Sequence, residues 1–173
     1  MTQTALITLG RLPKGLDIAR ALAAAGWRVI VAEPFPWHLM RVSRSVDASF
    51  AVRAPNDDLE GYLCDLLAII REQGVSLIVP ISEEILPVVE LEDRLPDGVR
   101  LFSPEAAKIH RVHDKLAFSV LAKDLGLAVP ETADAVSPAG DEIARAGRHV
   151  VKPALSCSGI GVEIRDAEPL GAP

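Results

Sequence analysis

The stretch TALITLGRLPKGLDIARALAAAG, residues 4–26, decides the fold, because it joins an apolar run to an amphipathic run through a turn. TALITL is almost wholly apolar and ends at Gly10, which is the pattern of a strand buried on both faces. In KGLDIARALAAAG, leucine and alanine recur at helical spacing, and Gly26 supplies a stop. The stretch therefore predicts the first strand–helix unit of a parallel sheet.

The same alternation continues as far as residue 103. Four further strands are predicted, at WRVIVAE, DASFAVR, VSLIVPIS and VRLFS. A strong amphipathic helix, DDLEGYLCDLLAIIREQG, is predicted between DASFAVR and VSLIVPIS. EEILPVVELEDRLP is also predicted to be helical, with Pro87 in an early turn where proline is tolerated. Near-continuous apolar strands that alternate with helices indicate a doubly wound parallel sheet of the Rossmann type.

A different pattern follows Ser103. SPEAAKIHRV predicts a helix with Ser103 as N-cap and Pro104 at its first position, and HDKLAFSVLAKDLG predicts a second helix capped by Asp114. SPAGDEIARAG predicts a third helix with the same Ser-Pro start. RHVVKPAL predicts a strand, which is followed by a glycine loop and by a second predicted strand, VEIRDA. The final EPLGAP has no pattern of secondary structure. We expect a domain boundary near residues 103–112.

Composition narrows the classes of function. Apolar residues make up 49% of the chain and aromatic residues only 4%, which favours helices on a parallel sheet over a β-sandwich. The net charge of -6 argues against non-specific nucleic-acid binding but allows a small anion held by backbone N–H groups. Cys64 and Cys157 have no metal-binding spacing and fit a reducing compartment. With no leader pattern and no long apolar run, we expect a cytoplasmic protein without a membrane partner.

The turn TLGRLPKGLD after the first strand is a candidate ligand site. Gly10 and Gly15 are five residues apart with bulky side chains between them, so the glycine pattern of a dinucleotide site is broken. Glu33 ends the second strand, where a ribose-binding acid would lie. A tight turn is therefore favoured over NAD binding.

The turn PISEE after the fourth strand is a second candidate. Ser82 is expected to cap the next helix, and Glu83 and Glu84 suit the positive end of that helix. Paired carboxylates at the carboxyl end of a strand could also bind a substrate amine or a metal.

The segment HRVHDKLAF carries two histidines and a lysine. His110 and His113 lack a third ligand nearby in the sequence, which argues against a metal site. Lys115 lies in the first turn of a predicted helix, where a cation opposes the helix dipole. It is either a solvated surface lysine or a residue that faces a phosphate.

The segment VVKPALSCSGIGV is not a Walker A loop but has parts that suit a nucleotide. Lys152 comes late in an apolar strand, so we expect its stem to be buried and its ammonium group to be directed. Small residues then allow backbone N–H groups to form an anion-binding concavity. A plain hairpin loop explains the same pattern equally well.

Taken in order, these segments resemble the ATP-grasp ligases. The chain contains, in this order, an α/β domain, the segment HDKLAFSVLAKDLGLAVPET, the strand VVKP and a loop ending in GIGV. This order resembles that of biotin carboxylase and D-alanine–D-alanine ligase. Within this family, the N-terminal domain of the carbamoyl-phosphate-synthase-like group most resembles the segments ALITLGRLPKGLDIARALAAAGWRVIVAE and VPISEEI. The resemblance implies a Rossmann-like pre-ATP-grasp domain over residues 1–104. The start of an incomplete α+β ATP-grasp domain would follow over residues 105–173.

The resemblance also implies ATP as the cofactor, with two lysines and a loop backbone at its phosphates. These residues are Lys115, Lys152, Ser156, Ser158, Gly159 and Gly161. The two turns would face the acceptor substrate through Gly10, Arg11, Ser82, Glu83 and Glu84. No catalytic or metal-ligating residue is implied. Cys157 and Ile160 stand where smaller residues are common, which predicts a stiffer loop.

The implied activity joins an unknown carboxylate to an amine or similar nucleophile through an acylphosphate. Phosphoryl transfer of this kind uses Mg²⁺, which the family holds with residues beyond this hairpin, so we expect Mg²⁺ only with that second half and no activity from this chain alone. A cut sequence, a truncated gene and an enzyme split between two chains all stay open, as do self-association and a complementing chain. The alternatives are a non-catalytic nucleotide-binding or partner-binding module and an NAD-type oxidoreductase domain.

Overall fold

The computed structural model describes residues 2–167, so EPLGAP at 168–173 lies outside the described residues. The chain divides into two compact units, residues 1–106 and residues 107–173. Within residues 2–167, no helix combines the length and the apolar character needed to cross a membrane.

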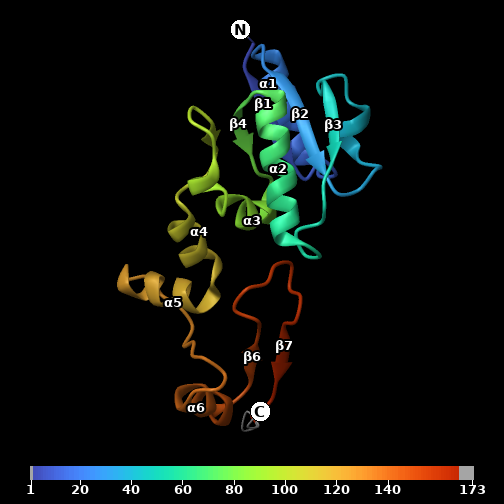
Figure 1. The fold of residues 1–173 in the computed structure, drawn as a ribbon. Helices are drawn as coiled ribbons and strands as arrows, with labels where there is room; N and C mark the ends of the chain where they lie inside the picture. Colours follow the sequence, from blue (N-terminus) through green and yellow to red (C-terminus); the bar gives the residue numbers. More distant parts are fainter. Residues whose placement is uncertain (1, 168–173) are drawn as a thin grey trace. The chain divides into compact units, whose positions relative to one another are not determined.

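The first unit is built on a five-stranded sheet in the order β3-β2-β1-β4-β5 (Figure 1). All of its strand pairs are parallel. The strands are β1 (Thr4–Thr8), β2 (Arg28–Glu33), β3 (Ala48–Ala51), β4 (Val75–Val79) and β5 (Arg100–Leu101). This confirms the predicted doubly wound sheet. The strand order reverses between β1 and β4, and ligands of such sheets bind beyond the carboxyl ends of the strands at that point.

Helices cover both faces of this sheet. Leu6 of β1 belongs to a core cluster with α2, whereas the next residue, Ile7, belongs to a second cluster with α1. Because successive strand residues point to opposite faces, a strand buried on both faces is mostly apolar, and in β1 Ala5, Leu6 and Ile7 lie between the buried residues Thr4 and Thr8. The helical elements are α1 (Pro13–Ala24), η1 (Leu39–Val42), α2 (Leu59–Gln73), η2 (Ser82–Glu84), α3 (Ile85–Val89) and η3 (Glu92–Arg94).

Local signals in the sequence place most of these helix ends. Asp58 caps α2 by accepting a hydrogen bond from the Gly61 N–H at 2.9 Å, and Gly74 ends the helix with φ +61°.

The predicted capping of a helix by Ser82 is wrong. Its hydroxyl donates to the Glu83 carboxylate, and its backbone has φ +57° in place of the extended conformation of an N-cap. The helix expected after it is divided into η2, α3 and η3.

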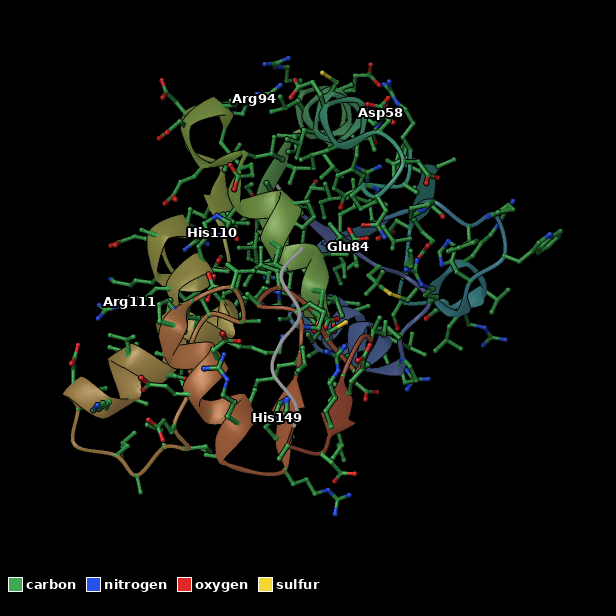
Figure 2. All side chains as sticks on the ribbon, turned by 90° about the horizontal axis from the view of Figure 1, so that it is seen from below. Asp58, Glu84, Arg94, His110, Arg111 and His149 are labelled. Atoms are coloured by element: carbon green, nitrogen blue, oxygen red, sulfur yellow. The ribbon has the colours of Figure 1, made fainter. Side chains whose placement is uncertain are left out.

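The second unit consists of short helices and a hairpin. Asp114 caps α5 by accepting from the N–H groups of Leu116 and Ala117 at 2.8 and 2.9 Å, as predicted. The helix predicted to start at Ser103 begins instead at Ala106, because the Ser103 hydroxyl donates to the carbonyl of the next residue and caps nothing. His149 begins β6 and is labelled in Figure 2. The elements are α4 (Ala106–His113), α5 (Lys115–Asp124), α6 (Pro138–Ala146) and antiparallel β6 (His149–Val151) and β7 (Glu163–Arg165).

Candidate functional site

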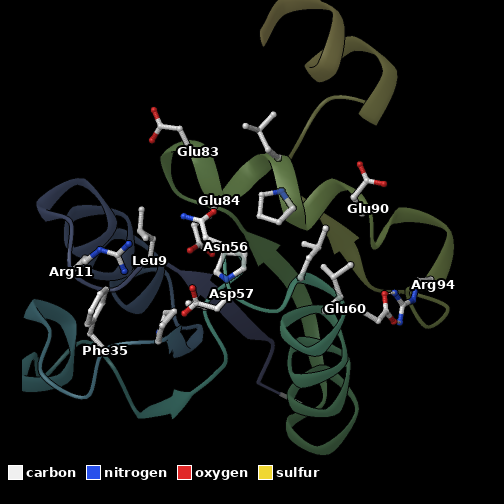
Figure 3. A pocket seen from close by; sticks show the side chains of 17 residues that line it. Leu9, Arg11, Phe35, Asn56, Asp57, Glu60, Glu83, Glu84, Glu90 and Arg94 are labelled. Atoms are coloured by element: carbon white, nitrogen blue, oxygen red, sulfur yellow. Dashed lines mark hydrogen bonds and ion pairs between the residues drawn. The ribbon is translucent and has the colours of Figure 1, made fainter. Parts of the chain in front are cut away.

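A hollow of about 930 Å³ opens at the carboxyl edge of the parallel sheet in the first unit (Figure 3). Arg11, Glu83 and Glu84, all expected to face a substrate, line it. Gly10 and Ser82 are chain neighbours of these residues but are not among the lining residues. Two turns that are more than 70 residues apart in the sequence therefore meet at one site, where the strand order reverses.

One wall of the hollow is an arginine held in place by a buried carboxylate. The Glu33 side chain is fully buried and forms an ion pair with the Arg11 guanidinium group. It also accepts hydrogen bonds from the Arg11 N–H at 3.1 Å and the Phe35 N–H at 3.2 Å. The guanidinium carbon lies 4.9 Å from the centre of the Phe35 ring. The acid that would bind a dinucleotide ribose is thus already paired, which further disfavours NAD binding.

The backbone of both turns is strained. Leu9 and Ser82 each have φ +57°, a conformation that side chains with a Cβ rarely adopt. Each such residue costs about 1–3 kcal/mol, and strain of this kind clusters at ligand sites. Gly10 has a separate reason to be glycine, because a Cβ there would lie 2.5 Å from Nδ1 of His38. That glycine accommodates a side chain of the same unit and not a pyrophosphate.

Glu84 is turned inward. Its residue is only 6% exposed, and its carboxylate accepts a hydrogen bond from the hydroxyl of Tyr62, which is fully buried. Burial raises the pKa of the Glu84 carboxyl group, although the Tyr62 hydrogen bond opposes the shift. Burial also raises the pKa of the Tyr62 hydroxyl, and the Glu84 charge raises it further. Glu83 is exposed, so the two adjacent carboxyl groups have different environments.

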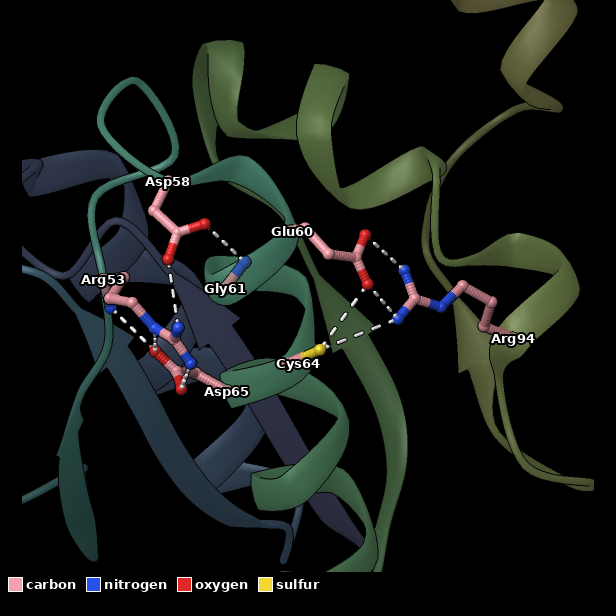
Figure 4. A network of polar contacts seen from close by, with 7 residues as sticks. All are labelled: Arg53, Asp58, Glu60, Gly61, Cys64, Asp65 and Arg94. Atoms are coloured by element: carbon pink, nitrogen blue, oxygen red, sulfur yellow. Dashed lines mark hydrogen bonds and ion pairs between the residues drawn. The ribbon is translucent and has the colours of Figure 1, made fainter.

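Two arginines form three ion pairs with carboxylates of α2 and its cap, which the sequence did not reveal (Figure 4). Arg53 binds Asp65 at 2.7 Å and Asp58 at 3.0 Å, and its hydrogen bonds hold the pKa of Asp65 below the usual value. Arg94 binds Glu60 at 2.7 Å, and this pair lines the hollow. Arg94 and Glu60 are 34 residues apart, so no local pattern in the sequence specifies their pairing.

In the second unit, Lys115 and the loop after β6 are in direct contact. The Lys115 ammonium group donates to the Ser156 carbonyl at 2.6 Å, the Ser156 hydroxyl at 3.1 Å and the Ala154 carbonyl at 3.3 Å. The backbone N–H of Lys115 also donates to the Ala154 carbonyl, at 3.1 Å. The structure therefore brings together two of the residues expected at the phosphates of ATP.

Lys152 differs from the prediction. The residue is exposed, so its stem is not buried as the apolar strand suggested. The reason is that β6 ends at Val151 and pairs only with β7 within residues 2–167. In that part of the chain, Lys152 forms no hydrogen bond or ion pair.

The remaining loop residues form an exposed turn. Ser158, Gly159 and Gly161 have φ +55°, +77° and +72°, and their N–H groups donate to no acceptor within the described part of the chain. Gly161 is required at its position, because a Cβ would lie 2.8 Å from Cγ of Pro153. Consecutive N–H groups in left-handed conformations are the elements of an anion-binding concavity. Cys157, within this loop, is a free thiol.

The chain is similar in fold to solved structures of ATP-grasp ligases, as the sequence resemblance predicted. A biotin carboxylase domain of a single-chain bacterial carboxylase matches 86% of this chain with a TM-score of 0.63 and 22% identity. The biotin carboxylase domain of Hydrogenobacter thermophilus 2-oxoglutarate carboxylase, in complex with MgADP, ADP and bicarbonate, matches 98% with a TM-score of 0.71 and 16% identity. N5-carboxyaminoimidazole synthetase from Staphylococcus aureus matches 97% with a TM-score of 0.66 and 18% identity.

This chain spans 36%, 38% and 42% of those three chains, respectively. No family model matches the sequence. No curated protein matches it either. The similarity is therefore one of fold.

Proposed function

We propose that this chain provides phosphate-binding residues and an acceptor-substrate pocket of an ATP-grasp ligase. In this proposal residues 1–104 are the pre-ATP-grasp domain and residues 105–173 are the first part of the ATP-grasp domain. The observation that carries the proposal is the contact between Lys115 and the loop at Ser156, next to a turn with unpaired N–H groups. This contact joins the helix that begins at Lys115 to the hairpin loop, and the resemblance to the ATP-grasp ligases rests on these two segments.

The residues of the hairpin suit a polyphosphate. The exposed ammonium group of Lys152 supplies a positive charge, and the N–H groups of Ser158, Gly159 and Gly161 supply neutral donors. Donors of this type bind phosphate oxygens without a large net positive charge, which agrees with a chain of net charge -6. Mg²⁺ would be held only once the second half of the ATP-grasp domain is present, because the resemblance implies no metal ligand in this chain.

The hollow in the first unit is our proposed acceptor site. Arg11 and Glu83 line it with opposite charges, and Phe35 adds an exposed aromatic face. The inward-facing Glu84 supports the wall through Tyr62 and has little surface for contact with a substrate. In a ligase of this kind, ATP would phosphorylate a carboxylate, and an amine or a similar nucleophile would attack the acylphosphate.

The hairpin also supports a proposal about partners. Val150 and Ile164 face each other across β6 and β7, yet they are 54% and 63% exposed. Exposed apolar residues on a sheet with open edges favour association. We therefore include a complementing chain or a second copy among the partners of the proposed ligase.

Calorimetric titration of this chain with MgATP tests the nucleotide site. We expect millimolar or tighter binding, no binding of NAD, and at least tenfold weaker MgATP binding in Lys152→Ala, since loss of a charged contact costs about 1.5 kcal/mol or more. Lys123→Ala is the matched control, because it removes the same charge from an exposed position at the end of α5. Equal affinities in the parent and Lys152→Ala, or an equal loss in the control, would contradict the proposal.

A further inference from the structure

The ammonium group of Lys115 has no free donor. An ammonium group carries three N–H donors, and three acceptors surround this one at 2.6–3.3 Å. All of these acceptors belong to Ala154 and Ser156 of the loop. A phosphate oxygen can bind Lys115 only by displacing one of them.

The position of Lys115 in its helix explains why the loop acceptors matter. Asp114 fixes the first turn of α5, and Lys115 is the first residue of that helix. A cation at a helix N-terminus is opposed by the partial positive charge of the unpaired N–H groups there. The carbonyl oxygens of Ala154 and Ser156 place partial negative charge beside the ammonium group and offset this effect.

Lys152 stands in contrast to Lys115, although the resemblance gives both the same role. It is exposed and has no partner within residues 2–167, so its charge is available to a ligand. Among residues 2–167, the hydrogen bonds that join the following loop to α5 all come from Lys115 and end on Ala154 and Ser156.

We infer that Lys115 is a positioning residue, which holds residues 154–156 in place before a nucleotide arrives, while Lys152 is the lysine that meets the phosphates. Lys115 acts by fixing the base of the turn at residues 158–161, in which the N–H groups of Ser158, Gly159 and Gly161 donate to no acceptor within the described part of the chain. The inference depends on the proposed function only for the identity of the ligand. Its central claim, that Lys115 orders the loop, holds in the absence of any nucleotide.

The thiol of Cys157 reports on this claim, because it lies next to Ser156 and is partly buried. Cys64 is exposed, so all variants are made in a Cys64→Ser background. The measurement is the rate at which a chromogenic disulfide reagent labels Cys157 without nucleotide. Lys115→Met should raise this rate about tenfold, the effect of losing hydrogen bonds to a charged group. Lys152→Met makes the same chemical change and should leave the rate within about twofold of the background.

Two further variants separate loop positioning from general unfolding. Lys115→Arg keeps donors that reach carbonyl oxygens and should restore most of the slow labelling. Ser156→Ala removes one of the three acceptors and should raise the rate by a smaller factor than Lys115→Met. Equal labelling in the background and Lys115→Met would overturn the inference. So would a rise in Lys152→Met as large as that in Lys115→Met, or no restoration by arginine.

The same variants distinguish failure of this inference from failure of the proposed function. If MgATP binds, Lys152→Met should lose affinity with unchanged Cys157 labelling, whereas Lys115→Met should change both. If MgATP does not bind the parent chain, the proposed function fails, and the labelling rates without nucleotide still decide the role of Lys115.

Discussion

The two units of this chain are stabilised by different means. In the first unit, large apolar side chains such as Leu66 and Ile78 are fully buried on the two faces of the sheet. In the second unit, the buried residues among those described are small or polar, namely Ala122, Gly140, Ala144 and His149. Its geometry depends instead on helix caps and on the contacts of Lys115 with the loop. The second unit should therefore be sensitive to the loss of single hydrogen bonds and insensitive to truncation of its apolar side chains.

The largest expected difference between the units comes from truncating one apolar side chain in each. Leu66→Ala should lower the free energy of unfolding of the first unit by about 2–5 kcal/mol, because Leu66 is completely buried. Phe118→Ala in the second unit should cost less than about 1 kcal/mol, because Phe118 is 47% exposed. Both tryptophans, Trp27 and Trp37, lie in the first unit, so their fluorescence during urea denaturation reports on that unit.

The fluorescence midpoint should thus shift strongly in Leu66→Ala and stay unchanged in Phe118→Ala. Far-UV circular dichroism, which reports on the helices of both units, is the control for each variant. A large loss of stability in Phe118→Ala seen by circular dichroism, with an unchanged fluorescence midpoint, would show that the second unit has a core of its own.

A smaller effect is expected at Glu84, and it depends on pH. Burial raises the pKa of this carboxyl group above its ordinary value of 4.5, so the folded chain holds the proton more tightly than the unfolded chain. The resulting stabilisation is complete below pH 4.5 and is lost as the pH rises through the folded pKa. Above that range the folded chain must bury a carboxylate, which Glu84→Gln avoids.

Glu84→Gln should therefore match the parent near pH 4 and become the more stable protein as the pH rises towards 8. The measurement is the urea midpoint by tryptophan fluorescence at a series of pH values. Glu83→Gln is the control, because Glu83 is exposed. A stability difference that is constant with pH would contradict the raised pKa.

The same comparison between units explains which features the sequence could predict. Periodicity and capping residues are local signals, and they predict the strands, the caps at Asp114 and Ser137, and the end of α2 at Gly74. For the start of α2 they leave Asp57 and Asp58 as alternatives, of which the structure has Asp58. The ion pair of Arg11 with Glu33 joins residues 22 apart, and no local pattern specifies it.

The exposure of Lys152 was missed for a related reason. An apolar strand predicts burial only if other elements cover it, and β6 has a single neighbour, β7, in the described part of the chain. Sequence patterns thus identified the strands of both units, but the helix expected after Ser82 is divided into η2, α3 and η3, and the helix predicted from Ser103 begins at Ala106. They predicted the surroundings of a side chain well only in the first unit, where a complete sheet covers its own strands.

The smallest predicted effect concerns the cap of α5, and it is the sharpest test of how the second unit is stabilised. Asp114→Ala removes the acceptor of two backbone N–H groups and should destabilise the helix start by about 1 kcal/mol. Hydrogen exchange at Leu116 and Ala117 should become about fivefold faster, while the tryptophan midpoint of the first unit stays the same. Asp114→Asn keeps an acceptor and should exchange nearly as slowly as the parent. If Asp114→Ala left both amides protected, caps would not be what stabilises this unit, and the contact of Lys115 with the loop would have to order the first turn of α5 instead.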